Sequence, residues 1–186
     1  LRLDRRLGPA AWAAAALVAL PVPPFMHAAA HWLAFSMLFG GGTVVTLPVG
    51  RFDPVETWRL VAAEHVNILV VVGDAMARPL VDALEADGGA DIDASSLMAL
   101  GSGGALLSPS TKARFRARLP NLMVRDAFGA SETGQIGGAP PADDPDGAPR
   151  LHVDDRTAVF DDDLCPVEPG SGAVGDLARG GRVPLR

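Results

Sequence analysis

One stretch, residues 97–134, restricts the fold more than any other part of this 186-residue chain. It contains two short apolar runs, residues 97–100 and 122–124, and each is followed by a loop of small residues. Between the runs, Ser108 and Pro109 provide the N-cap and the first position of a helix. This order of strand, loop, helix, strand and loop places both loops at one edge of the sheet if the strands are parallel. Open α/β sheets bind their ligands at that carboxyl edge.

The preceding residues continue the same alternation. Short apolar or β-branched runs predict strands, and longer segments with capping residues or helical composition predict helices. The strands are expected at residues 17–22, 43–47 and 67–72, and the helices at residues 27–39, 53–64 and 75–86. The fold class is therefore α/β, a doubly wound, mostly parallel sheet with flanking helices. Because residues 27–39 are apolar nearly all round, we expect that helix to be buried.

The two loops in the first stretch offer different chemistry. Residues 101–105 (GSGGA) present bare backbone, so a flat ligand can approach closely. Residues 128–134 (FGASETG) present an aromatic ring, hydroxyl groups and one carboxylate. A flat ring and a polyphosphate carrying Mg²⁺ would use such groups, because Mg²⁺ binds one or two carboxylates and fills its other positions with phosphate oxygens and water.

These two motifs, SGGALLSP at residues 102–109 and FGASETG at residues 128–134, resemble core motifs of the AMP-forming adenylating enzymes. The resemblance is greatest to the actinobacterial fatty-acid and steroid-acid CoA ligases, and it extends from about Pro21 to Leu185. Many members of this family have Tyr where this chain has Phe128, so stacking on a base is retained and the phenol hydroxyl is lost.

The resemblance implies roles for individual residues. Phe128 is expected to stack on adenine, Ser131 to contact phosphate, and Glu132 to hold Mg²⁺, with Ser131 and Glu132 as the catalytic residues. The nucleotide-binding residues implied in this way are Gly103, Gly104, Ala105, Phe128, Gly129 and Ser131. The implied ligands are ATP, Mg²⁺, a carboxylic acid and CoA as co-substrate.

Residues that follow other predicted strands provide a candidate acyl pocket. His27 ends a Pro-Pro-Phe-Met-His segment similar to one beside the acyl pocket of the family, although a structural role at the start of a helix fits it equally well. Gly73 and Met76 follow the strand at residues 67–72, and Gly103 completes the set. For Asp74 we favour helix N-capping over pocket lining.

The composition changes after Gly138. Residues 1–138 are expected to form part of an α/β nucleotide- and acyl-binding subdomain, residues 139–150 a linker rich in proline and aspartate, and residues 151–186 the start of a small β subdomain. Three aspartates at 161–163 lack the spacing of a calcium-binding EF-hand loop, so we expect a hairpin turn there.

Several parts that the family needs are absent from the sequence. It has no phosphate-binding loop upstream of residue 23, and no ribose-binding aspartate or mobile domain with its catalytic lysine after Leu185. We therefore expect a fragment of an ATP-dependent carboxylic acid–CoA ligase, acting on a fatty or other apolar acid. The fragment alone is expected to be inactive, because charge stabilisation of the transferring groups would be incomplete.

The composition also argues against several other kinds of partner and location. A net charge of −6 argues against a nucleic-acid partner. Cys165 is the only cysteine and cannot form an internal disulfide, so we expect a cytoplasmic location. The apolar run at residues 9–22 follows arginines in the manner of a secretory signal, but a buried helix and strand explains it better, and it is too short to span a membrane. The oligomeric state is left open.

Three alternatives remain. A non-catalytic remnant or binding domain would keep the sheet without the chemistry. A serine hydrolase is a distant alternative, since residues 129–133 (GASET) lack the last glycine of a GxSxG elbow and His152 is the only histidine after Ser131. A dinucleotide site is weaker, because residues 101–106 lack the last glycine of GxGxxG.

Overall fold

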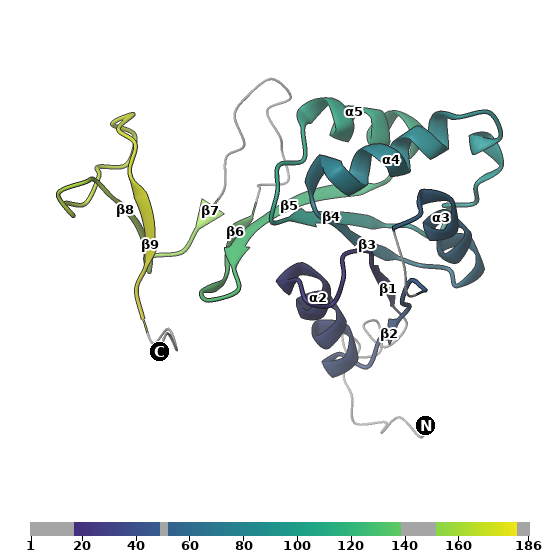
Figure 1. Ribbon diagram of the computed structural model, residues 1–186, viewed down its shortest axis with the longest axis horizontal. Helices are drawn as coiled ribbons and strands as arrows, with labels where there is room; N and C mark the ends of the chain where they lie inside the picture. Colours follow the sequence, from purple (N-terminus) through teal and green to yellow (C-terminus); the bar gives the residue numbers. More distant parts are fainter. Residues whose placement is uncertain (1–16, 49–51, 139–151, 182–186) are drawn as a thin grey trace. The chain divides into compact units, whose positions relative to one another are not determined.

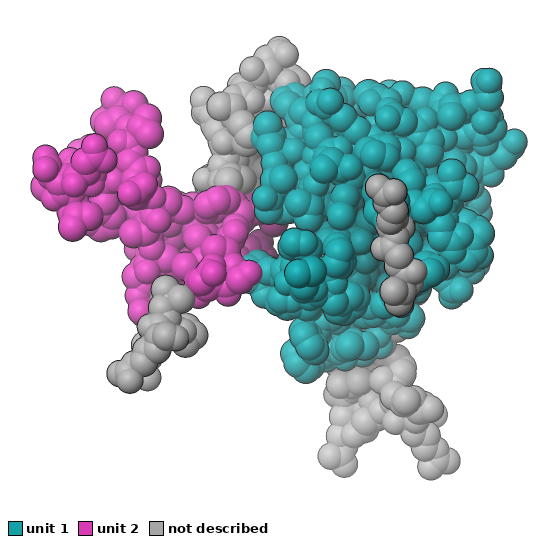
Figure 2. Space-filling model, in the orientation of Figure 1, with its two compact units in different colours: residues 1–126 teal, residues 127–186 magenta. Residues whose placement is uncertain are grey.

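The computed structural model describes residues 17–48, 52–138 and 152–181 (Figure 1). The expected linker at residues 139–150 and most of the apolar run at residues 9–22 lie outside this part of the chain. The chain divides into two compact units, residues 1–126 and 127–186, which Figure 2 shows in separate colours. Among the described residues, no helix is long and apolar enough to cross a membrane.

The first unit is the expected α/β sheet with flanking helices. Strand β1 (Val18–Pro21) pairs in parallel with β2 (Thr43–Val44) on one side and with β3 (Ile68–Val71) on the other, and β3 pairs in parallel with β4 (Ala99–Gly103). Hydrogen-bonded neighbours follow the order β2-β1-β3-β4-β5-β6-β7, where β5 is Met123–Ala130, β6 is Gly134–Gly138 and β7 is His152–Val153. Because the chain moves from β1 to β2 and then to β3 on the far side of β1, the strand order reverses between β1 and β3.

Helices cover both faces of this sheet (Figure 1). Helices α3 (Pro54–Ala63), α4 (Gly73–Glu85) and α5 (Pro109–Arg118) pack side by side on one face, and α2 (Ala28–Phe39) packs against β1 on the other. A short 3₁₀ helix, Gly89–Asp91, follows α4. The predicted caps are present, because the Asp53 carboxylate accepts the N–H groups of Val55 and Glu56, and the Ser108 hydroxyl accepts that of Thr111. The alternation predicted from the sequence is confirmed.

The core of the first unit lies between the sheet and helices α3, α4 and α5. Its largest fully buried side chains are Trp58 on α3 and Phe115 on α5, which pack with leucines and valines of the central strands. The Trp58 indole N–H donates to the Leu80 carbonyl at 2.9 Å, so the polar atom of this ring is also satisfied.

Helix α2 differs from the prediction. Only Ala30, Ala34 and Met37 of this helix are buried, and the apolar side chains of Phe35, Leu38 and Phe39 are exposed. Phe35 and Phe39 stack with their ring centroids 6.0 Å apart. The small residues face the sheet, because alanine lets the helix approach closely, and the large residues form the outer face. The expectation that this helix is buried was therefore wrong.

The second unit is built from antiparallel strands. The end of β5 pairs with β6 (Gly134–Gly138), and β6 pairs with β7 (His152–Val153). Strands β8 (Thr157–Phe160) and β9 (Asp176–Arg179) form a separate pair. The Asp161 carboxylate accepts the N–H groups of Asp163 and Cys165, which is the geometry of a local turn. No cluster of three or more metal-ligating side chains occurs among the described residues.

Candidate functional site

The loop that follows β4 is tied to the first turn of α4. The N–H of Gly73 donates to the Ser102 hydroxyl at 3.0 Å, and the N–H of Asp74 donates to the Leu106 carbonyl at 3.0 Å. Ser102 is buried, whereas Gly104, Ala105 and Leu106 are exposed. The loop therefore presents backbone at the carboxyl edge of the sheet, held from beneath by hydrogen bonds.

Gly73 is required by this close approach. Its φ of +53° is in the left-handed region, and a Cβ at this position would lie 2.6 Å from the Leu106 carbonyl oxygen and 2.8 Å from Ala105 Cβ. The structure thus brings together two sites singled out in the sequence, Gly73 and the glycine-rich loop, by direct packing of α4 against the loop.

Asp74 does not cap its own helix, contrary to the preferred expectation. Helix α4 begins at Gly73 with Val72 at the N-cap position, and it has no side-chain cap. Instead, the Asp74 carboxylate accepts the N–H of Ser108 at 2.9 Å and forms an ion pair with Arg78 at 2.8 Å. Burial raises the pKa of Asp74, but hydrogen bonds from Ser108, Thr111 and Arg78 outweigh burial and hold that pKa below its usual value.

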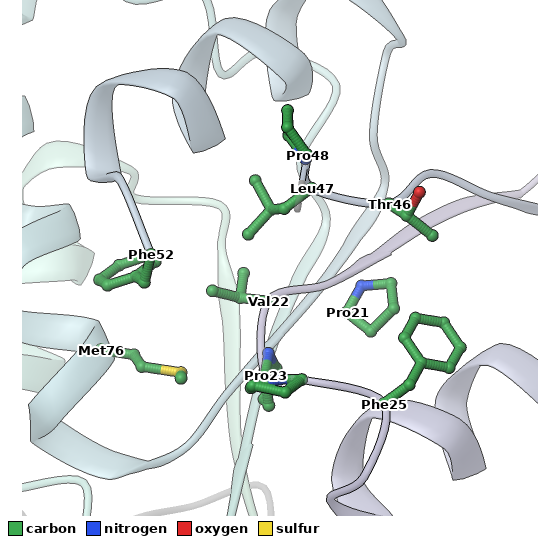
Figure 3. A pocket seen from close by; sticks show the side chains of 10 residues that line it. Pro21, Val22, Pro23, Phe25, Thr46, Leu47, Pro48, Phe52 and Met76 are labelled. Atoms are coloured by element: carbon green, nitrogen blue, oxygen red, sulfur yellow. The ribbon is translucent and has the colours of Figure 1, made fainter. Parts of the chain in front are cut away.

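An apolar cavity of about 350 Å³ opens at the carboxyl ends of β1 and β2 (Figure 3). Its β1 wall borders the point between β1 and β3 where the strand order reverses, and open α/β sheets bind ligands at such points. Among the described residues that line it, only Thr46 carries a polar side-chain group. The lining residues are Pro21, Val22, Pro23, Pro24, Phe25, Thr46, Leu47, Pro48, Phe52 and Met76. Such an apolar wall suits an apolar ligand.

Pro21 explains why the sheet opens here. The N–H of Val45 donates to the Ala19 carbonyl, and the next rung of this parallel ladder would need an N–H at position 21. Proline has none, so β2 ends at Val44 and residues 46–48 leave the sheet. The rigid rings of Pro21, Pro23 and Pro48 then form walls that resist collapse into the space.

The four predicted acyl-pocket residues occupy different positions. Met76 lines the cavity, and Figure 3 shows its side chain pointing toward it from α4. Gly73 and Gly103 lie at the glycine-rich loop and not in the cavity lining. His27 is exposed at the N-cap of α2, where its side chain makes no capping bond, and Phe25 of the same segment lines the cavity.

The second motif forms a β-hairpin instead of the expected loop. Phe128 and Gly129 belong to β5, which runs to Ala130, and only residues 131–133 form the turn into β6. A Cβ on Gly129 would lie 2.5 Å from the Gly134 carbonyl oxygen, so glycine is needed where the pairing shifts register between Phe128 and Gly129. The strand expected at residues 122–124 is β5, but its continuation to Ala130 was not predicted, because glycine and alanine have low β propensity.

The reactive groups of this hairpin are open to solvent. Phe128 is 39% exposed, and both Ser131 and Glu132 are exposed at the turn. A single accessible carboxylate fits the way Mg²⁺ is bound beside nucleotide phosphates, because the phosphates and water provide the remaining oxygen ligands. The donor set of this hairpin is therefore compatible with Mg²⁺ brought by a nucleotide.

An ion pair next to this motif was not found from the sequence. Lys112 on α5, the only lysine of the chain, pairs with Asp126 on β5 at 2.5 Å. Their side chains are 9% and 13% exposed, so most of the pair is buried. Two features of the sequence could have indicated this pair. Lys112 is a single lysine on a helix rich in arginine, and Asp126 is a residue type that is rare in strands.

Comparison with known proteins identifies the family. The family model described as AMP-binding enzyme matches residues 5–183, and this chain belongs to that family. A 3-oxocholest-4-en-26-oate–CoA ligase of Rhodococcus rhodochrous is 45% identical over 174 residues, which is 91% of this chain and 31% of that protein. The medium-chain acyl-CoA ligase Mig of Mycobacterium avium is 39% identical over 166 residues, covering 88% of this chain and 30% of the relative.

Solved structures share the fold. The amide bond synthetase McbA of Marinactinospora thermotolerans superposes with a TM-score of 0.68 at 25% identity, over 87% of this chain and 32% of that one. The N-terminal domain of FACL13 from Mycobacterium tuberculosis has a TM-score of 0.64 at 23% identity, over 85% of this chain and 41% of that domain. The chain thus spans about a third of the length of its curated relatives.

Proposed function

We propose that this chain is part of an ATP-dependent carboxylic acid–CoA ligase that acts on a fatty or other apolar acid. The observation that carries the proposal is the apolar cavity at the carboxyl ends of β1 and β2. It adjoins the first turn of α4, which also holds the exposed glycine-rich loop. The cavity suits an apolar acyl group and the bare loop suits a flat base. Relatives described as steroid-acid and fatty-acid CoA ligases agree with this substrate class.

In the proposed reaction, the acid carboxylate attacks the α-phosphorus of ATP, and pyrophosphate leaves as acyl-adenylate forms. The thiol of CoA then displaces AMP and gives the thioester. The protein contributes position and electrostatic stabilisation. Phe128 would stack on adenine. Gly129 would allow the close pairing of β5 with β6 that orients the Phe128 ring. Gly103, Gly104 and Ala105 would face the nucleotide.

The catalytic groups in this proposal are Ser131 and Glu132. Ser131 would donate a hydrogen bond to a phosphate oxygen, and Glu132 would hold Mg²⁺, which supplies charge neutralisation of the phosphates when bound. Met76 would contact the acyl group in the cavity, with His27, Gly73 and Gly103 at its approach. Partners in this proposal are ATP, CoA and the acid, in the cytoplasm, and the chain alone would not complete turnover.

The hairpin argues against the serine-hydrolase alternative. A nucleophile elbow places serine on a sharp turn between a strand and a helix, whereas Ser131 lies on a turn between two antiparallel strands.

A cavity-filling variant tests the acyl assignment. We expect Leu47→Trp to weaken binding of a fluorescent long-chain fatty acid about tenfold, or about 1.4 kcal/mol, because the indole would occupy the space lined by Leu47. The measurement is a fluorescence titration of the folded chain. Val55→Trp is the matched control, since Val55 is 70% exposed and does not line the cavity.

Equal weakening by both tryptophan variants, or none by Leu47→Trp, would place the probe elsewhere. The exposed face of α2 is the main competing surface, so Phe35→Ala is titrated in parallel. Loss of binding in Phe35→Ala alone would contradict the cavity as the acyl site.

A further inference from the structure

We infer that Asp74 is a positioning residue that holds the glycine-rich loop in the conformation used for nucleotide binding. This loop is residues 104–108, between β4 and α5, because residues 101–103 of the expected loop belong to β4. The inference rests on the proposed function and goes beyond the residues that touch substrate in it. Asp74 lies on the first turn of α4 and contacts the loop through both its backbone and its carboxylate.

Leu107 anchors the end of the loop in the core, but the residues before it depend on hydrogen bonds. Gly104, Ala105 and Leu106 are exposed, so burial of apolar side chains does not fix the conformation of these three residues. Besides the buried Leu107, three hydrogen bonds hold the loop: Gly73 N–H to Ser102 Oγ, Asp74 N–H to the Leu106 carbonyl, and Ser108 N–H to Asp74 Oδ1. Of the three, only the hydrogen bond from Ser108 N–H to Asp74 Oδ1 can be removed by a side-chain substitution that leaves Gly73 and the buried Ser102 unchanged.

The carboxylate is itself held in place. Asp74 Oδ2 accepts from Arg78 Nε at 3.0 Å, one helical turn further along α4, while Oδ1 stays directed at Ser108. Ser108 is also the N-cap of α5, so Asp74 fixes the point where the loop ends and that helix begins. Removing the carboxylate would take away the side-chain hydrogen bond at this end of the loop, and a ligand would have to order the exposed residues 104–106 on binding.

Two aspartate variants separate the hydrogen bond from the charge. Asp74→Ala removes the acceptor, and we expect it to weaken binding of a non-hydrolysable acyl-adenylate analogue about tenfold. Asp74→Asn keeps an oxygen that can accept from Ser108 and Thr111 and loses the negative charge that pairs with Arg78. Because the Arg78 side chain is 58% exposed, we expect binding within about twofold of wild type. Asp82→Ala, on the same helix but paired with Arg114, is the control.

Titration with the fluorescent fatty acid distinguishes a local effect of Asp74→Ala on the loop from a general loss of structure. The cavity is lined by Met76 and not by the loop, so Asp74→Ala should bind this probe as wild type does. Amide hydrogen exchange at Ser108 should be faster in Asp74→Ala and close to wild type in Asp74→Asn. Equal loss of both ligands, or no rescue by Asp74→Asn, would overturn the inference.

Failure of the proposed function gives a different pattern. If folded wild type does not bind the adenylate analogue, that function is contradicted for this chain. The exchange measurement then decides the inference alone: faster exchange in Asp74→Ala supports a loop held by Asp74, and unchanged exchange overturns it.

Discussion

Replacing Trp58 by alanine is expected to lower the free energy of unfolding of the first unit by about 3–5 kcal/mol. Trp58 is 1% exposed, and it is among the largest side chains of the core between α3, α4 and the sheet. Its removal would leave a cavity and also leave the Leu80 carbonyl without the indole N–H that donates to it. Urea unfolding followed by circular dichroism measures the change.

Two controls identify the source of this loss. Trp58→Phe keeps an aromatic ring and removes the N–H, so we expect a smaller loss of about 1–3 kcal/mol. Phe39→Ala, at a position that is 86% exposed, should change stability by less than about 0.5 kcal/mol. A Trp58→Ala variant as stable as Phe39→Ala would show that the core is not where the structure has it.

The second large effect is expected from the buried pair between α5 and β5. Lys112→Met leaves the Asp126 carboxylate mostly buried without its cation, and we expect a loss of about 3 kcal/mol. The value is placed at the lower end of the range for broken buried pairs, because both side chains retain some exposure to water. Chemical denaturation of the purified chain tests it.

The double variant Lys112→Met with Asp126→Leu separates charge from packing. Apolar replacement of a whole buried pair is often close to neutral, so we expect the double variant to recover most of the stability lost in Lys112→Met. If instead the double variant is as unstable as Lys112→Met, the loss arises from packing of the lysine stem and not from an unpaired carboxylate.

Much of the first unit could be predicted because its local signals agree. Asp53 followed by Pro54, and Ser108 followed by Pro109, mark helix starts that the structure confirms, and the continuous apolar run at residues 67–72 forms the central strand β3. Alternation of these elements was enough to place the glycine-rich loop at the carboxyl edge.

The errors arose where long-range contacts decide the outcome. Phe128 and Gly129 were expected in a loop, but pairing with β6 extends β5 to Ala130. Asp74 looked like an N-cap, but its carboxylate bonds to Ser108, 34 residues later in the chain. The helix expected at residues 27–39 was predicted to be buried because it is apolar nearly all round. Composition alone does not say which face of a helix meets a neighbour, and only one face of α2 is buried.

Calorimetric titration of the folded chain with a non-hydrolysable acyl-adenylate analogue tests the central claim most directly. We expect wild type to bind and Phe128→Ala to bind more weakly by about 1–3 kcal/mol, because a stacking face for the base is lost. Glu132→Ala should have a smaller effect on an analogue that carries no polyphosphate, and Phe39→Ala should have none. Absence of binding by the folded chain, or equal binding by Phe128→Ala and wild type, would contradict the assignment of this chain to the nucleotide site of an acid–CoA ligase.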